Sequence, residues 1–425
     1  MKKKINYLIA AMLDLQLFAV NKTTDVRDSV TGEGNDLSPE MKEFYDRVLI
    51  EEAGPNLVHA QFGQKKPIPK NNGKIITFRK FEPLMKALGQ LDEGTTPEGG
   101  KLDVTEIMSE IGQYGYFVVL SDLLELTAID PVVVEATKLI GQQAGRTMDT
   151  IVRNVLNSGT NVRYCPKLNG NTETPVGRRA ALNATAKLTP DMVQQVVADL
   201  RAMDAPTING DYVAIIHPYA AYDLMRNPEW IDAQKYVNPE KIYNGEIGKI
   251  GGVRFVQSSE AKIIRGEDLA SDSRTLSVNG AVTAGTTIIN FDGGTVAANA
   301  LKGKTIVVDS YEYVVDSNTA STITVKSDVP LLAIADNTVI YPAGASDGGA
   351  VFSTLFLGAN AYGDTEIADG GLRTIVKQLG YGDDPLDQRA SVGWKGTKTA
   401  EILVEQYIVR VESCSPRFSA TAVGN

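Results

Sequence analysis

The stretch that decides the fold is PVVVEATKLIGQQAGRTMDTIVRNVLN, residues 131–157. Its apolar side chains recur at the spacing of one face of an α-helix; they are Ala136, Ile140, Ala144, Met148, Ile151 and Val155. Asp130 and Pro131 form a typical helix start, and Gly159 supplies a stop. At the α-helical rise, this stretch makes a rod of roughly 40 Å. The sequence therefore predicts one long amphipathic helix that serves as the spine of a domain.

Two further helices begin with the same pair of signals, a capping side chain followed by proline. The first begins at Ser38-Pro39, runs to about residue 52 and stops at Gly54-Pro55. The other begins at Thr189-Pro190 and runs to about residue 204. Both signals are local, so the two helix starts do not depend on what packs against them.

Between the first helix and the spine the chain has a different texture. It is basic and proline-broken over 64–70, strand-forming over 74–81 (KIITFRKF) and turn-rich over 89–100 (GQLDEGTTPEGG). Residues 102–120 are again β-branched and aromatic. The pattern predicts two extended arms around a mobile tip, with little apolar surface to bury by themselves. We expect a neighbouring chain to order this excursion; the alternative is a surface β-ribbon folded back on its own domain.

Helix and strand textures then alternate in an α+β manner up to about residue 265. The strongest signals are a strand at 212–216, a helix at 219–226 and a strand at 252–257. Over 266–349 the chain becomes rich in Thr and Val, and ten acidic residues stand against four basic ones. Its turn spacing is typical of an all-β sandwich, such as an Ig-like one, or of a small barrel. We therefore expect an inserted β domain here, after which strands resume at 351–357 and 400–411.

The composition is that of an ordinary globular protein and excludes several classes. The 425 residues include 42 basic and 52 acidic side chains, for a net charge of −10. No run of about 18 apolar residues exists, so no helix is expected to span a membrane. Net acidity argues against a chain whose task is to grip nucleic-acid phosphates. The insert carries six of the ten net negative charges, which leaves the remaining body close to neutral.

Residues suited to catalysis or metal binding are scarce. The chain has two cysteines and two histidines, namely Cys165, Cys414, His59 and His217. The glycines of 248–252 lack the spacing of a phosphate-binding loop and predict a turn. Two acidic groups lack the spacing of a calcium loop; they are Asp364, Glu366 and Asp369, and Asp383, Asp384 and Asp387. We expect no enzyme, no catalytic residue, no metal, no cofactor and no disulfide.

The amino terminus, MKKKINYLIAAMLDLQLFAV (1–20), allows two interpretations. Three lysines before an apolar run are typical of a secretion signal, but Asn6, Asp14 and Gln16 interrupt that run. The competing interpretation is an arm and flexible link over 1–37 that docks on a partner. Together with the Thr- and Val-rich segment, the lysines motivate one rival hypothesis for the whole chain, a secreted bacterial surface or adhesion protein.

Several blocks of the sequence resemble, in the same order, the N4-like podophage family of major capsid proteins of tailed phages. The blocks are EGTTPEGGKL (93–102), IGQYGYFVVLSDLLELTAIDPV (111–132), VAIIHPYAAYDLMRNPEW (213–230), GGVRFVQSSEAKI (251–263), VFSTLFLGANAYG (351–363), DPLDQR (384–389), VGWK (392–395) and the strand over 402–411. The resemblance covers about residues 38–412 apart from the insert. LDLQLFA (13–19) is similar to the opening of structural proteins from phages of Gram-positive hosts, which favours the docking arm.

This resemblance implies the Hong Kong 97-type capsid fold, an α+β architecture. The helix over 131–157 would be the spine, and the excursion over about 64–115 would be an extended loop lying over an adjacent subunit. The axial domain would take about 189–263 and 350–400, within a capsid fold that spans 38–265 and 350–425. The segment 266–349 would be an accessory domain.

The implied function is self-assembly into the hexamers and pentamers of an icosahedral shell around the double-stranded DNA genome. The implied location is the virion, after assembly in the host cytoplasm, with no membrane. Scaffold, portal and decoration proteins are further implied partners, and contact with the packaged DNA would be nonspecific. Charged contacts between subunits are expected from the excursion, at Lys65, Lys66, Lys70, Lys74, Arg79, Lys80, Asp92 and Glu93.

Overall fold

The computed structural model describes most of the chain between residue 47 and the carboxy terminus. The described residues are 47–67, 74–81, 84, 101–102, 104–123, 132–170, 172–231, 248–365, 372–377 and 388–425. Lys70, Asp92, Glu93 and the predicted arm over 1–37 lie outside these ranges. The chain forms two compact units, and each is described by itself. The first takes Met1–Pro55, Gln113–Gly145 and Leu372–Gly396, and the second takes the rest.

The predicted spine is confirmed as helix α4, Val132–Leu156, whose amino-terminal half belongs to the first unit and whose remainder belongs to the second. Its buried stripe contains Ile140, Ala144, Met148, Val152 and Leu156. The sequence had assigned the last two positions to Ile151 and Val155, which are only half-buried. A strict four-residue step keeps Val152 and Leu156 on the buried side, so the apolar face drifts slowly around the helix.

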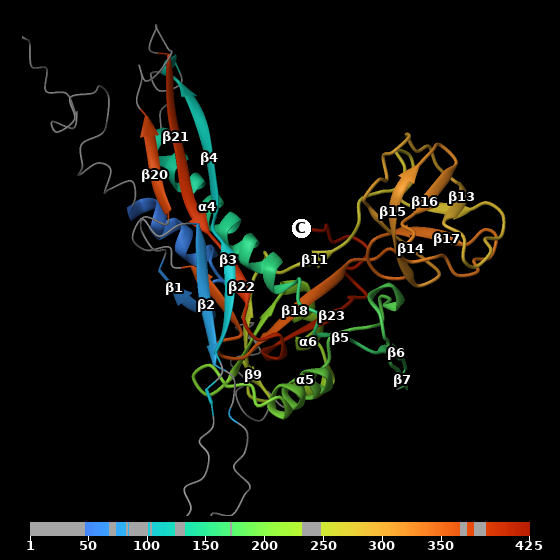
Figure 1. The fold of residues 1–425 in the computed structure, drawn as a ribbon, viewed down its shortest axis with the longest axis horizontal. Coiled ribbons are helices and arrows are strands. Elements are labelled where there is room, and N and C mark those ends of the chain that lie inside the picture. Colours follow the sequence, from blue (N-terminus) through green and yellow to red (C-terminus); the bar gives the residue numbers. More distant parts are fainter. Residues whose placement is uncertain are drawn as a thin grey trace, which may run out of the picture. The chain divides into compact units, whose positions relative to one another are not determined.

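The first unit contains a three-stranded sheet in the order β20–β21–β4 (Figure 1). The strands are β4 (Gly112–Ser121), β20 (Leu372–Lys377) and β21 (Arg389–Lys398). Residues 47–53 form a helix that ends at the 3-10 turn η1, Gly54–Asn56, where the sequence predicted the stop. The predicted start at Ser38-Pro39 lies outside the described residues.

A seven-stranded mixed sheet forms the centre of the second unit. Its order is β5–β23–β18–β8–β10–β9, with β11 paired to β18. The strands are β5 (Val162–Tyr164), β8 (Tyr212–Ile216), β9 (Lys249–Ile250), β10 (Val253–Gln257), β11 (Ile263–Ile264), β18 (Val351–Leu357) and β23 (Ile408–Ser413). Helices α5 (Pro190–Ala202) and α6 (Pro218–Met225) share one apolar core with this sheet. As predicted, α5 begins at a cap, because the Thr189 hydroxyl accepts a hydrogen bond from the Met192 N–H at 3.3 Å.

Smaller sheets surround the central one within the second unit. β1 (Gln64–Lys66), β19 (Tyr362–Thr365) and β22 (Ala400–Ile402) form one sheet, and β2 (Ile75–Phe81) and β3 (Val104–Glu110) form a hairpin. β6 (Lys167–Asn169) and β7 (Thr172–Thr174) form a second hairpin, followed by the 3-10 turn η2, Arg179–Ala181. The prediction of one continuous strand over 400–411 was wrong. The turn η3, Glu405–Tyr407, breaks it, so that β22 and β23 can join different sheets.

Six strands between residues 276 and 342 close into a barrel in the order β12–β13–β16–β15–β14–β17 (Figure 1, yellow to orange). They are β12 (Leu276–Val278), β13 (Ile288–Asp292), β14 (Thr305–Val308), β15 (Tyr311–Asn318), β16 (Thr322–Val325) and β17 (Val339–Pro342). Asp309 and Ser310 have φ values of 48° and 66°, which makes the link from β14 to β15 a two-residue hairpin turn. The alternating apolar side chains of these strands fill one separate core.

Among the described residues, no helix is both long and apolar enough to cross a membrane.

Candidate assembly surfaces

The outer face of the sheet in the first unit carries an exposed aromatic and basic surface. Trp394 of β21 is buried and donates its indole N–H to the Gln143 side-chain oxygen of α4 at 2.6 Å. Neighbouring residues of a strand point to opposite faces, so Gly393 and Lys395 face away from α4. Ile375 pairs with Gly393, which places Ile375 on this outer face as well.

Gly393 of β21 lets the neighbouring strand β4 come unusually close at the level of Tyr116 and Phe117. A Cβ atom at Gly393 would lie 2.8 Å from the Phe117 Cβ and 2.9 Å from the Tyr116 carbonyl oxygen. No other residue fits at that distance, so the glycine fixes how closely β4 and β21 pack. Phe117 then lies over the glycine with 68% of its surface exposed, and Tyr116 beside it is 55% exposed.

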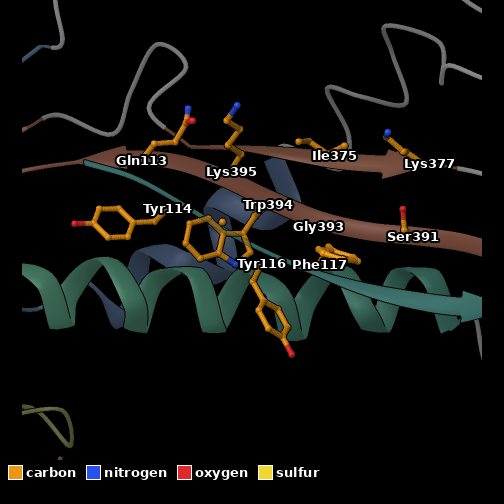
Figure 2. Close-up of a pocket in the computed structure, with 11 residues that line it drawn as sticks. Gln113, Tyr114, Tyr116, Phe117, Ile375, Lys377, Ser391, Gly393, Trp394 and Lys395 are labelled. Carbon is orange, nitrogen blue, oxygen red and sulfur yellow. The ribbon is translucent and has the colours of Figure 1, made fainter. Parts of the chain in front are cut away.

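These side chains line a cavity of about 550 Å³, open to solvent. Figure 2 shows Lys395 and Gln113 pointing away from helix α4, drawn in green, whereas Tyr116 points toward it. The side chains that line it on the outer face include the apolar Phe117 and Ile375 and the cations Lys377 and Lys395, and none of the described lining residues is acidic; Tyr116 and Trp394 also border it, but their rings point toward α4. The arrangement suits a segment that combines apolar and acidic side chains. We call this surface the aromatic groove.

The hairpin of β2 and β3, in the second unit, has one buried and one exposed face. Ile76 and Phe78 on the inner face are 1% exposed and pack against Leu403 and Val404. Gly363 makes this packing possible, because a Cβ there would lie 2.5 Å from two ring carbons of Phe78. The base of the predicted excursion is therefore anchored on its own chain.

The outer face of the same hairpin presents apolar and acidic residues together. Met108 is 65% exposed and Ile75 is 55% exposed. Ile75 pairs with Glu110, and Arg79 pairs with Glu106 across the two strands, so these side chains share the outer face. The Arg79 Nε lies 3.2 Å from the Glu106 Oε1 in an exposed ion pair.

The structure distributes the five described cations of the predicted contact set differently. Lys65 and Lys74 are exposed, Lys80 is half-buried, and Arg79 is paired with Glu106. Lys66 lies in β1 and donates its ammonium group to the Thr77 carbonyl of the hairpin. Lys66 thus contributes to the anchoring of the hairpin on its own chain.

Residues 102–120 are visibly rich in aromatic side chains in the sequence, but the contacts predicted between subunits were charged residues. A signal for the aromatic groove was present, because consecutive large side chains such as Tyr116 and Phe117 cannot both enter one core from a strand. The partner strands β20 and β21 were not identifiable, since they lie far away in the sequence.

His59, His217, Cys165 and Cys414 are all buried, and each is placed as part of the fold. The His59 Nδ1 lies 2.6 Å from the Asp149 Oδ2, and both side chains are fully buried. His217 caps α6, where burial lowers its pKa to about 4. Burial raises the pKa of Cys414 to about 12 and that of Cys165 further, so both are inert thiols. No cluster of three metal-ligating side chains occurs among the residues that the structure describes.

Comparisons with known proteins agree with this architecture. Residues 122–379, more than half of the chain, match the family described as phage capsid protein. The capsid asymmetric unit of cyanophage Pam1 is similar in fold, with a TM-score of 0.51 and 11% identity over 94% of this chain and 99% of that chain. The capsid of Ralstonia phage GP4 gives a TM-score of 0.49 with 13% identity, over 84% and 90% of the two chains. The capsid of cyanophage P-SCSP1u gives 0.49 with 14% identity, over 83% and 86%.

No curated protein sequence matches the chain. The family match decides against the rival hypothesis of a secreted surface protein, because it covers the spine, the central sheet except for β23, and the barrel segment together. The mixed α+β fold, built on the long helix α4, is similar to that of phage capsid structures. This chain therefore belongs to the phage capsid protein family and is a major capsid protein that forms the shell of the phage head.

Proposed function

We propose that the chain is a Hong Kong 97-type subunit of the N4-like podophage group, and that hexamers and pentamers of it close into an icosahedral shell around double-stranded DNA. The observation that carries the assembly mechanism is the chemical match between two surfaces of the same chain. The aromatic groove is apolar and basic, and the outer face of the β2–β3 hairpin is apolar and acidic at Glu106 and Glu110. The groove of one chain therefore fits the hairpin face of a second copy of the chain.

In this mechanism, the hairpin of one subunit lies in the aromatic groove of the next. Such a contact joins two different patches, so it is heterologous and generates rings when the rotation closes. Burying Phe117, Met108 and Ile75 supplies apolar area, at roughly 25 cal/mol per Å². The charges of Lys395 and Glu110 set the register more than the strength of the contact. Because each subunit engages several neighbours, weak contacts become cooperative.

The other parts of the chain have supporting roles in this proposal. The barrel would be an accessory domain inserted in the capsid fold, and its excess of acidic residues suits exposure to solvent. Residues 1–37 would form an arm that docks on a partner. Scaffold, portal and decoration proteins are further proposed partners, with nonspecific contact to DNA and assembly in the host cytoplasm.

Charge reversal across the two surfaces tests the assembly mechanism. The variant Lys377→Glu/Lys395→Glu should assemble at least about tenfold less, because acidic residues would then face Glu106 and Glu110. Combining it with Glu106→Lys/Glu110→Lys should restore closed particles, counted by negative-stain microscopy and analytical ultracentrifugation.

Two controls make this result specific. Each variant should keep an unfolding midpoint in urea close to that of wild type, because Glu106 and Glu110 are exposed and Lys377 and Lys395 are only half-buried. Reversing Lys302 and Lys326, which are exposed on the barrel, should leave the particle yield unchanged. Restored yield in the fourfold variant supports the pairing of the surfaces; wild-type yield in the lysine double variant refutes it.

A further inference from the structure

Two adjacent arginines connect the barrel to the central sheet, all within the second unit. The Arg178 guanidinium carbon lies 3.8 Å from the centre of the Tyr311 ring, which is within cation–π distance. The Arg179 Nη1 lies 3.7 Å from the Glu312 Oε1. Tyr311 and Glu312 are the first two residues of β15, so the arginines contact the wall of the barrel. We call these two contacts the arginine clasp.

Arg179 is held in place by the central sheet. Its Nε and Nη2 donate to the two carboxylate oxygens of Glu412 at 2.7 Å and 2.6 Å. Glu412 lies in β23, is fully buried, and also lies 3.1 Å from the Arg410 Nε. A planar guanidinium that is bound at two points cannot rotate, so its remaining nitrogen has a fixed direction. That nitrogen, Nη1, is the one near Glu312.

The arginine also separates two like charges. Burial raises the pKa of Glu312. The charge of Arg179 lowers this pKa, and the charge of Glu412 raises it. Without a cation between them, the carboxylates of the sheet and of the barrel would repel each other. Arg179 therefore converts an unfavourable approach of β15 to β23 into an attachment.

A second attachment lies at the neck of the barrel, where the chain enters and leaves it. The Gly266 N–H donates to the Ala343 carbonyl at 2.6 Å, which joins the two neck segments. The backbone N–H and hydroxyl of Ser346 both donate to the Leu182 carbonyl, at 2.8 Å and 2.7 Å. A barrel held only at its neck can pivot, whereas a second contact on its wall removes that freedom.

We propose that the arginine clasp fixes the barrel in one orientation on the central sheet, so that it is a rigid projection of the subunit instead of a tethered appendage. This inference goes beyond shell formation and concerns the single chain. It is tested on unassembled protein, so its failure is distinguishable from a failure of the assembly mechanism.

The test measures the distance between barrel and sheet by electron spin resonance on doubly spin-labelled full-length chain. Exposed sites for the labels are Ala198→Cys on α5 and Lys302→Cys on the barrel, because Cys165 and Cys414 are buried. The unmodified clasp should give one narrow distance distribution. Arg178→Ala/Glu312→Ala removes both barrel contacts but keeps Arg179 on Glu412, and should broaden the distribution by at least about twofold.

Conservative variants keep the test informative if that double variant folds poorly. Tyr311→Phe retains the ring and should keep the narrow distribution, whereas Arg178→Lys loses planar stacking and should broaden it. Lys249→Ala breaks an ion pair with Asp211 away from the barrel and should change nothing. A broad distribution in the parent chain, or an unchanged one in both Arg178 variants, would overturn the proposal.

Discussion

His217 shows how one side chain at a helix start links folding to pH. Its Nδ1 accepts a hydrogen bond from the Tyr219 N–H at 3.1 Å, and its ring stacks on Phe352 with centroids 5.5 Å apart. The hydrogen bond needs an unprotonated Nδ1, and burial lowers the pKa from the ordinary value of 6.5 to about 4. The unfolded chain therefore binds a proton at a pH where the folded chain does not.

We expect His217 to make the protein less stable as the pH falls from about 6.5 toward 4. Between pH 7.5 and about pH 5, the free energy of unfolding of wild type should fall by about 2 kcal/mol more than that of His217→Asn. Asparagine also caps a helix but does not titrate. Urea unfolding of both proteins at the two pH values measures the difference, and parallel losses would contradict the assignment.

At the scale of elements, the position of the hairpin depends on a close contact that only glycine permits. Phe78 of β2 lies directly on Gly363 of β19, and β1 beside it is paired in parallel with β19. The local sequence around Gly363 looks like an ordinary turn followed by a strand. Its importance is visible only when the hairpin, almost 300 residues earlier, is placed on it.

Gly363→Ala should destabilise the second unit by roughly 1–3 kcal/mol, because the new methyl group must displace the Phe78 ring from a packed core. Gly177→Ala is the matched control, since a Cβ at Gly177 meets nothing within 4 Å. The free energy of unfolding in urea measures both. Adding Phe78→Leu to Gly363→Ala should recover part of the loss; equal stability of the two alanine variants would contradict the packing argument.

At the scale of the whole molecule, an exposed aromatic side chain is a cost for the monomer that association removes. Phe117 contributes little to the folded monomer because it is 68% exposed. Yet it lines the aromatic groove, and exposed aromatic residues are often the anchors of a protein interface. Stability and assembly should therefore respond differently to its removal.

Phe117→Ser should keep the free energy of unfolding within about 0.5 kcal/mol of wild type and lower the yield of closed particles. Ile288→Ser provides the comparison, because Ile288 is also exposed, at 53%, but lies on the barrel. Light scattering during assembly distinguishes them. Loss of assembly in both variants, or in neither, would show that the aromatic groove is not the interface.

Local signals determined several features from the sequence alone. The spacing of apolar residues over 131–157 predicts α4, and the Thr189-Pro190 pair predicts the start of α5, because capping and periodicity act within a few residues. The Thr- and Val-rich composition of 266–349 indicates many short strands for the same reason. The break at Glu405–Tyr407 was missed, since the alternating pattern continues through it.

Only the tertiary structure decided which distant segments meet. The aromatic groove requires β4 to pair with β21, and the arginine clasp requires Arg179 to lie between Glu312 and Glu412. No periodicity or spacing encodes such pairings, because their free energy comes from burial and charge between residues far apart in the chain. The sequence therefore determined the helices and the β-rich segment, whereas the surfaces that we propose for assembly arise from how those elements fold together.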